Sequence, residues 1–443
     1  MKSNLAPINE EMIKAYLYDA VEKSNGQIKN ITVKKSLGAA SVGQALLCEI
    51  EDKDGNKNKK ECVVKLLRPD VYNRAMREKE IFEQAAREVP GMEITFDGQL
   101  KSIMDELDLT KEAENVEDGK VYNNTFNDVK SMNIIRPPEP TKNVLILEKA
   151  PGQTIDSYIN KDKEGGVYKN VVDLIDEIKN SENKLATQDE VVRIKDALDE
   201  LLRAQRALIN LSTLWVIKGI YGNGFYHGDL HAGNMMIDPN VEEIDKTTGE
   251  TKKNAKLTVI DFGNATKLTK DQQSNIMLMM ASASVGDEGR FMKGFRKLLT
   301  ESGKKDWDKK QDVLRRIFKE VLNKGDEKST GERIAVALTE AQKQGIEIPA
   351  PIFKFSQCQI RLSNAVDSIN KAMKNIVDEI YSIDFPEELD DQKIFKGLKK
   401  SVSEANNPKT FFDCMADVID SNLTSSLWKL GLWDAFRIKM QMK

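Results

Sequence analysis

The sequence predicts an α+β protein of two lobes, with a small strand-rich N-terminal lobe and a larger, mainly helical C-terminal lobe. Residues 31–67 have the pattern of strands on either side of a polar turn that contains Asp54-Gly55. The segments after residue 270 instead have the apolar spacing of helices. A chain of 443 residues is also long enough for two lobes, each with its own core.

The predicted boundaries divide the chain into four parts. These are an N-terminal helical segment (1–30), the strand-rich lobe (31–150), the first part of the helical lobe (151–270) and its helical remainder (271–443). Helices are expected over 8–22, 71–88 and 99–122. A stretch rich in lysine and acidic residues, at about 160–196, is predicted to be an insertion.

Composition excludes some function classes. The net charge of -4 argues against a nucleic-acid-binding protein, whose domains usually carry a basic stripe. Lysines and acids alternate along most of the chain, which indicates solvated helix faces. The four cysteines have spacings that fit neither a zinc site nor a disulfide framework, so we expect a reducing, cytoplasmic environment. No cleavable secretory signal is visible, although a non-cleaved one would escape this reasoning.

The C-terminal segment 425–443 has apolar residues with basic neighbours. It is expected to be the last helix of the C-terminal lobe, and the alternative is a helix that lies on a membrane surface. No run of about 18 apolar residues exists, so no transmembrane segment is expected.

The two histidines of the chain fall within one short window, HGDLHAGN at 227–234. Phosphoryl transfer needs a carboxylate that orients the attacking hydroxyl, and Asp229 is the candidate. His227 is expected to brace the loop, and His231 to contact phosphate or substrate. An alternative is a zinc site made by the His-x-x-x-His pair, but Gly228 and Gly233 favour a loop over a helix.

A second polar motif, VIDFG at 259–263, follows the histidine window. Short strands are predicted at 234–237 and 257–262, with a charged loop or hairpin tip between them. Asp261 lies at the end of the second strand, and with Asn234 it would supply the oxygen ligands that Mg²⁺ prefers. The combination of H-x-D, an asparagine five residues later and a strand ending in D-F-G is highly specific for this chemistry.

Three weaker signals precede these motifs in the order that a protein-kinase-like fold requires. Lys65 places a charge in an apolar strand, where an anion such as a nucleotide phosphate would neutralise it. The small residues at 38–43 would let the backbone approach phosphates closely. The helix that contains 105–115 offers Glu106, Glu112 and Glu114 as partners for Lys65. Together the five pieces predict a cleft between the lobes that binds ATP or ADP with Mg²⁺.

The sequence resembles the UbiB family of atypical kinases, whose eukaryotic members serve coenzyme Q biosynthesis. The resemblance covers about 31–270 and rests on GAASVGQ (38–44), VVKLLRPDV (63–71), DELDLTKEAEN (105–115), LILEKAPGQTIDSY (145–158), HGDLHAGN (227–234) and VIDFGNA (259–265). The K-x-G-Q helix of that family has no counterpart here, Gly38 replaces an alanine and Ala232 stands where the family has proline.

The resemblance implies a role for each matching residue. Lys65 would pair with Glu112 and reach the phosphates, Asp229 would be the catalytic-loop aspartate, and Asn234 with Asp261 would hold Mg²⁺. The phosphates would be covered by Gly38, Ala39, Ala40, Ser41, Val42, Gly43 and Gln44, and the adenine would meet backbone groups at Glu148 and Ala150.

The leading hypothesis is therefore an ATP-dependent phosphotransferase or ATPase with a UbiB-like core and an unidentified small-molecule, lipid or protein acceptor. HGDLHAGN and IDFGNA resemble aminoglycoside and choline phosphotransferases as well, so a small-molecule kinase is the enzyme alternative. The alternative without catalysis is a pseudokinase that binds nucleotide and regulates a partner.

Overall fold

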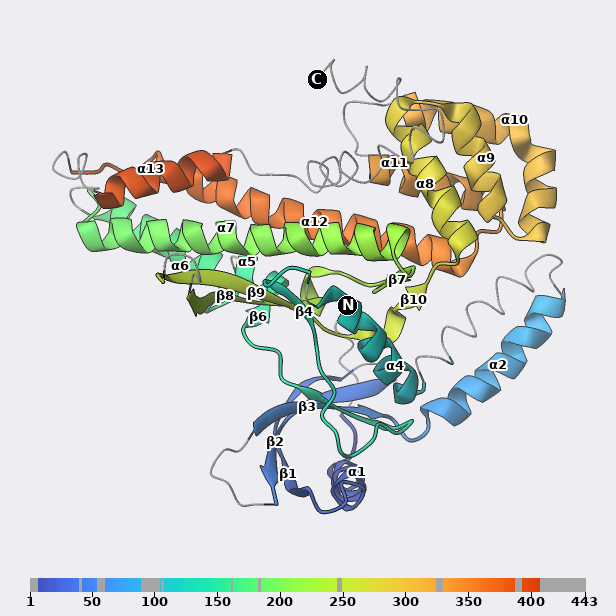
Figure 1. Ribbon diagram of the computed structural model, residues 1–443, viewed down its shortest axis with the longest axis horizontal. Coiled ribbons are helices and arrows are strands. Elements are labelled where there is room, and N and C mark those ends of the chain that lie inside the picture. Colours follow the sequence, from blue (N-terminus) through green and yellow to red (C-terminus); the bar gives the residue numbers. More distant parts are fainter. Residues whose placement is uncertain are drawn as a thin grey trace. The chain divides into compact units, whose positions relative to one another are not determined.

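The computed structural model describes residues 7–39, 42–53, 60–88, 104, 107–123, 125–160, 162–181, 185–244, 249–323, 330–386 and 393–406 (Figure 1). The chain forms two compact units. The first contains Met1–Val121, Ser131–Ala150 and Ile260–Thr266, and the second contains Tyr122–Lys130, Pro151–Val259 and Lys267–Lys443. The α+β prediction, with a small strand-rich region before a mainly helical remainder, is confirmed.

The first unit contains an antiparallel sheet of four strands in the order β1-β2-β3-β5. The strands are β1 (Ile28–Ala39), β2 (Gly43–Asp52), β3 (Lys60–Leu67) and β5 (Val144–Glu148). Because β3 pairs with β2 on one side and with β5 on the other, it is an interior strand.

Helix α1 (Glu10–Glu22) packs against this sheet and closes its core. The side chain of Asn9 caps its first turn by accepting a hydrogen bond from the backbone N–H of Glu11 at 2.9 Å. The core between helix and sheet contains Ile13, Leu17, Ala20, Ile31, Leu46, Cys48, Cys62, Val64, Leu66 and Ile146. Because successive side chains of a strand point to opposite faces, the burial of Val64 and Leu66 in this core turns Lys65 to the other face.

Two further helices of the first unit are α2 (Val71–Glu88) and α4 (Leu109–Gly119). The sequence predicted one helix over 99–122; residues 99–103 lie outside the described part of the chain, and α4 begins at Leu109. The cause is Asp108, whose side chain accepts a hydrogen bond from the backbone N–H of Thr110 at 3.0 Å and so caps the helix there. Asp105 and Glu106 lie outside the described residues.

The second unit has a sheet in the order β4-β9-β8-β6, made of β4 (Val129–Ser131), β9 (Thr251–Val259), β8 (Met235–Ile244) and β6 (Gln153–Thr154). The β8–β9 hairpin continues into the charged stretch that the sequence predicted to be a loop or hairpin tip. Opposite charges face each other there, with Glu242 opposite Lys253 and Glu243 opposite Lys252, and such cross-strand pairs stabilise a hairpin.

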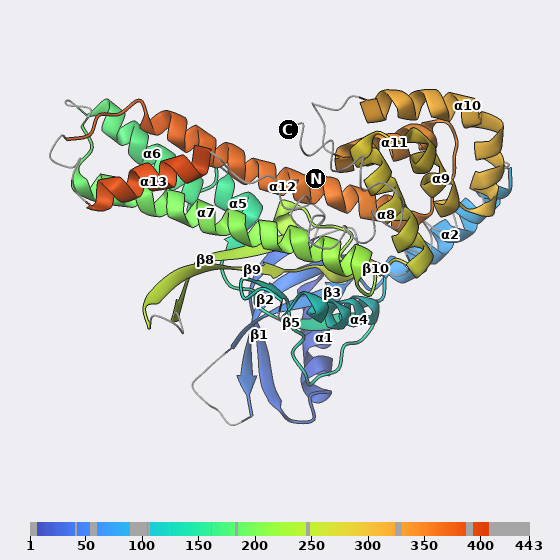
Figure 2. The same cartoon turned by 45° about the horizontal axis from the view of Figure 1, so that its top comes forward.

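Two long helices, α7 (Gln188–Val216) and α12 (Ala350–Ile380), lie side by side in the second unit (Figures 1 and 2). A capping box between Thr187 and Glu190 begins α7, which continues as the π-helix η2 (Ile217–Tyr221). Helix α6 (Val167–Asn180) packs against both long helices. The short elements are η1 (Lys120–Tyr122), α5 (Ile155–Ile159), β7 (Phe225–Tyr226), η3 (Ala232–Asn234), η4 (Phe262–Asn264) and β10 (Thr266–Lys267).

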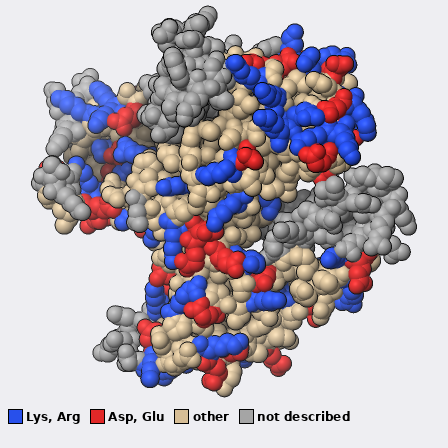
Figure 3. All heavy atoms as spheres, turned by 45° about the vertical axis from the view of Figure 1, so that its right-hand side comes forward, with Lys and Arg blue, Asp and Glu red and all other residues tan. Residues whose placement is uncertain are grey.

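Four more helices of the second unit are α8 (Lys270–Val285), α9 (Glu288–Leu298), α10 (Glu301–Asn323) and α11 (Thr330–Lys343). Figure 3 shows lysines, arginines and acids interspersed on the surface. Many of them pair locally, as Arg296 does with Asp308 at 2.8 Å. None of the described helices is both long and apolar enough to cross a bilayer.

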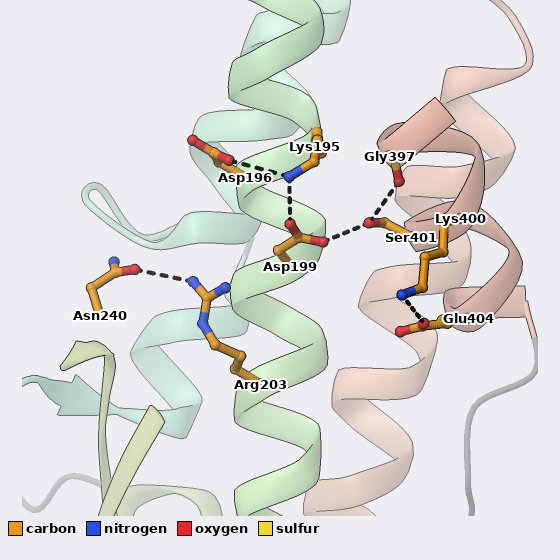
Figure 4. A network of polar contacts seen from close by, with 9 residues as sticks. All are labelled: Lys195, Asp196, Asp199, Arg203, Asn240, Gly397, Lys400, Ser401 and Glu404. Atoms are coloured by element: carbon orange, nitrogen blue, oxygen red, sulfur yellow. Dashed lines mark hydrogen bonds and ion pairs between the residues drawn. The ribbon is translucent and has the colours of Figure 1, made fainter. Parts of the chain in front are cut away.

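Helix α13 (Lys393–Asn406) is held against α7 by the polar network in Figure 4. Asp199 of α7 is its centre: one carboxylate oxygen accepts a hydrogen bond from the hydroxyl of Ser401 at 2.5 Å, and the other pairs with Lys195 at 2.7 Å. The segment 425–443, for which a C-terminal helix was predicted, lies outside the described residues.

Candidate active site

A first group of candidate site residues is centred on Lys65 in the first unit. Its Nζ lies 2.5 Å from Oε1 of Glu112 on α4 and 2.8 Å from Oδ1 of Asp261. The Lys65 side chain is only 20% exposed, and that of Glu112 is 8% exposed. The structure therefore selects Glu112 from the glutamates that the sequence offered, and it adds Asp261 as a second partner.

The electrostatics of this cluster keep Lys65 charged. Burial by itself lowers the pKa of Lys65, but the negative charges of Asp261 and Glu112 outweigh it and raise the pKa above the ordinary lysine value. Burial and the nearby Asp261 carboxylate raise the pKa of Glu112, against the charge of Lys65. One ammonium between two carboxylates leaves a local charge of about -1, which a cation would neutralise.

Helix α4 also positions the turn that carries Asp261. The side-chain nitrogen of Asn115 donates to the backbone oxygen of Phe262 at 3.0 Å. Phe262 is fully buried, and its ring packs so closely on Gly119 that a Cβ there would lie 2.4 Å from the ring. Asp261 itself has a left-handed backbone (φ 63°), so the predicted strand over 257–262 ends at Val259 instead.

The small-residue segment joins β1 to β2. Ala39 pairs with Gln44 across the hairpin, and Ala40 and Ser41 lie outside the described residues. A Cβ on Gly43 would lie 2.5 Å from the backbone oxygen of Leu66, so this glycine is required by the neighbouring strand. No atom lies within 4 Å of the Cβ position of Gly38, and Val42 is half-buried.

The side chain of Gln44 is bound within the first unit. Its oxygen accepts a hydrogen bond from the backbone N–H of Ile8 at 2.7 Å, and its nitrogen donates to the hydroxyl of Ser36 at 3.1 Å. These bonds tie the start of the described chain to the hairpin. Both atoms of the Gln44 amide are therefore used in hydrogen bonds that stabilise the first unit.

The end of β5 carries the predicted adenine-contacting residues. The backbone N–H of Glu148 donates to the oxygen of Asn133 at 2.9 Å, and the Glu148 carboxylate pairs with Lys60 at 2.6 Å. The backbone of Ala150, which is half-buried, follows this strand at the end of the first unit.

A second group of candidate site residues lies in the loop from His227 to Asn234 in the second unit. His227 is fully buried, and its Nδ1 accepts a hydrogen bond from the backbone N–H of Asp229 at 3.2 Å. Asn234 is 6% exposed, and its side-chain nitrogen donates to the backbone oxygen of Asp229 at 3.0 Å. His231 is exposed, and its Nδ1 accepts from the N–H of Gly233 at 3.0 Å. The loop is thus braced from both ends around Asp229.

A residue that sequence reasoning did not single out, Arg361 of α12, forms an ion pair with the Asp229 carboxylate. Neighbouring contacts bind the same helix to the loop. Cys358 lies beside Gly228 and Leu230. Burial raises the pKa of the Cys358 thiol to about 12, and hydrogen bonds with the backbone of Leu230 and Gly228 partly oppose this rise. No local sequence pattern indicates the pairing of Arg361 with Asp229, because helices α8 to α11 separate the loop from α12 along the chain.

One side chain in each unit presents an oxygen atom of the kind that Mg²⁺ prefers. The nitrogen of the Asn234 amide is used in its bond to Asp229, which presents the amide oxygen as the atom for a cation. The Asp261 side chain is 50% exposed, so its carboxylate is accessible as well. Among the described residues no three His, Cys, Asp or Glu side chains gather as a protein-only metal cluster. Mg²⁺ commonly uses one or two protein groups together with substrate phosphates.

Comparison with known proteins identifies the family. No curated protein matches the chain significantly. Among solved structures, the complex structure of Rv3197-erythromycin from Mycobacterium tuberculosis aligns over 82% of this chain and 80% of that chain, with 13% identity and a TM-score of 0.42. The family model of the ABC1 atypical kinase-like domain matches residues 1–294, more than half of the chain, and confirms the resemblance to the UbiB kinases. The chain belongs to the ABC1 atypical kinase-like family.

Proposed function

We propose that this protein binds a magnesium nucleotide and transfers the γ-phosphate of ATP to an acceptor hydroxyl or to water. The observation that carries the proposal is the cluster of Lys65, Glu112 and Asp261. A lysine ammonium has three donors, and two of them are directed at these carboxylates, so its position and direction are fixed. A fixed, charged lysine with a remaining donor is suited to bind the nucleotide phosphates.

Each residue has a role in the proposal. Lys65 contacts the α- and β-phosphates, and Glu112 fixes its direction. Asn234 and Asp261 would hold Mg²⁺, which when bound neutralises charge on the phosphates. Residues 38–44 cover the phosphates, and backbone groups at the end of β5 meet the adenine.

Asp229 orients the acceptor in this proposal. Its carboxylate accepts a hydrogen bond from the attacking hydroxyl or water, and it receives the proton as the new bond to phosphorus forms. His227 contributes by its buried bond to the backbone N–H of Asp229, which supports the loop conformation. The acceptor, whether small molecule, lipid or protein, is not specified by these groups.

Two ion pairs favour a second candidate, a nucleotide-binding pseudokinase. Asp261 is paired with Lys65 and Asp229 with Arg361, so both carboxylates that turnover needs are engaged in ion pairs within the protein. A scaffold that binds nucleotide without turning it over could retain both pairs.

An assay of phosphate release from MgATP distinguishes the enzyme from the pseudokinase. The proteins compared are the wild type, Asp229→Asn and Asp162→Asn. For an enzyme, Asp229→Asn should lower the rate by about 10²–10⁴-fold, which is the usual contribution of a positioned base. Asp162 is exposed and serves as the matched control. Equal rates for the wild type and Asp229→Asn, with nucleotide binding retained in both, would favour the pseudokinase.

A further inference from the structure

The catalytic loop itself carries no lysine or arginine. Between His227 and Asn234 its polar side chains are carboxylate, imidazole and amide groups. Phosphoryl transfer spreads negative charge over the oxygens of the moving group, and kinases and GTPases neutralise it with metal ions and cationic side chains. A cation close to Asp229 would therefore be chemically useful, and Arg361 of α12 is such a cation.

Several contacts hold α12 on the loop that carries Asp229. The hydroxyl of Tyr226, just before the loop, donates to the backbone oxygen of Pro351. Phe355 stacks on Trp215 of α7 with ring centroids 4.3 Å apart and meets Tyr226 edge to face at 5.3 Å. These contacts fix the backbone of α12, so the Cα atom of Arg361 has a fixed position relative to the loop.

The exposure of Arg361 suits a group that meets a ligand. Its side chain is 44% exposed, whereas the Asp229 side chain is 20% exposed. The neighbouring Gln359 and Leu362 are buried, and the more exposed guanidinium of Arg361 reaches Oδ1 of Asp229, which is a buried atom. A guanidinium has five donors in a planar fork, which matches the oxygens of a phosphoryl group.

We propose that Arg361 is a catalytic residue that binds the phosphoryl group during transfer. The inference rests on the proposed function. An acceptor within hydrogen-bond reach of Asp229 brings the reacting phosphorus close to the same carboxylate, and therefore close to the guanidinium that pairs with it. As MgATP and acceptor bind, Arg361 moves its donors from Asp229 to the phosphoryl oxygens and so frees the carboxylate for the acceptor proton.

The bonds balance in this step. A bond forms between the acceptor oxygen and the γ-phosphorus, and the bond from that phosphorus to the β,γ-bridging oxygen breaks, with its electron pair leaving on ADP. The acceptor proton passes to Asp229. Arg361 exchanges hydrogen bonds only and remains protonated throughout.

The test uses MgADP with and without aluminium fluoride, which together imitate the transferring phosphoryl group, on the full chain. The variants are Arg361→Gln, Arg361→Lys and the control Lys371→Gln, an exposed position on the same helix. In the wild type and the control, aluminium fluoride should raise the melting temperature beyond MgADP alone. Arg361→Gln should keep the MgADP shift, lose the additional shift and hydrolyse ATP at least about 10³-fold more slowly, as expected for loss of a catalytic arginine. Arg361→Lys should give a melting-temperature shift and a hydrolysis rate between those of the wild type and Arg361→Gln, because lysine keeps the positive charge but lacks the planar set of guanidinium donors.

Two results would overturn the inference. One is an Arg361→Gln variant with wild-type turnover. The other is slower turnover with the aluminium fluoride shift intact, which would assign Arg361 the lesser role of orienting Asp229. A wild type that shows neither a magnesium-dependent nucleotide shift nor turnover would instead refute the proposed function, and that outcome is visible before any variant is compared.

Discussion

Asn115 donates a hydrogen bond to the backbone oxygen of Phe262 at 3.0 Å, and this bond joins the helix of Glu112 to the turn of Asp261. The turn needs such support, because a left-handed backbone costs a residue with a side chain about 1–2 kcal/mol. One helix thus sets the positions of both carboxylates that hold Lys65.

Loss of the Asn115 side chain should loosen this turn. We expect Asn115→Ala to lower the free energy of unfolding by about 1 kcal/mol, as for one hydrogen bond. MgATP affinity should fall by more than this stability change accounts for, because Asp261 would no longer be held in place. Urea unfolding and nucleotide titration measure the two effects. Glu114→Gln, at an exposed position where the carboxylate pairs with Lys111, is the control, and equal affinities in both variants would contradict the role given to Asn115.

A methyl group on Gly119 should be destabilising. The added Cβ would lie 2.4 Å from the buried Phe262 ring, and such overpacking typically costs about 1–3 kcal/mol. Gly38→Ala is the matched control, because no atom lies within 4 Å of its Cβ position. Denaturant unfolding should show a lower midpoint for Gly119→Ala alone. A midpoint equal to that of the control would show that Phe262 does not pack on α4 in solution.

Stability should fall above neutral pH because of Cys358. Burial raises the pKa of its thiol to about 12, against about 8.5 in an unfolded chain. Because the pKa is higher in the folded protein, the unfolded chain loses its thiol proton first. The contribution of the thiol to the free energy of unfolding is therefore complete below pH 8.5 and is lost as the pH rises toward 12. Between pH 7.5 and 9.5 the wild type should lose about 1 kcal/mol more than Cys358→Ala. Parallel pH profiles for the two proteins would refute the burial of this thiol.

The contact between α7 and α13 should be separable from the candidate site. Ser401→Ala removes the hydrogen bond to Asp199 in Figure 4 and should cost about 1 kcal/mol, with nucleotide binding unchanged. Hydrogen exchange should increase over α13 alone. The control is Lys400→Ala, whose pair with Glu404 is long, at 3.8 Å, and exposed. A loss of nucleotide affinity in Ser401→Ala would contradict this separation.

The motifs that the sequence reveals best are those whose residues lie close together along the chain. Asp229 and Asn234 share one loop, and their spacing alone brings the Asn234 amide to the Asp229 backbone. Lys65 could be recognised because a charge in an apolar strand needs a partner. The choice of Glu112 among the candidate glutamates came from family resemblance, since the helix register alone left it open.

Other features depend on contacts that no local pattern encodes. Arg361 reaches Asp229 from a helix much later in the chain, and Asn115 meets Phe262 across 147 positions. The start of α4 at Leu109, inside the segment 99–122 that was predicted to be helical, depends on capping by Asp108, which the apolar pattern does not reveal. The β8–β9 hairpin was predicted too short because its outer part is stabilised by opposite charges rather than by apolar residues.

Thermal unfolding measures whether the protein has a magnesium-dependent nucleotide site that contains Asp261. The wild type, Asp261→Asn and Asp162→Asn are heated with MgATP, with MgADP, with nucleotide and EDTA, and without nucleotide. At 100 times its dissociation constant a nucleotide adds about 2.7 kcal/mol. We predict a clear rise in melting temperature for the wild type and Asp162→Asn that requires magnesium and is lost in Asp261→Asn. A wild type that melts at the same temperature in all four conditions would contradict the account.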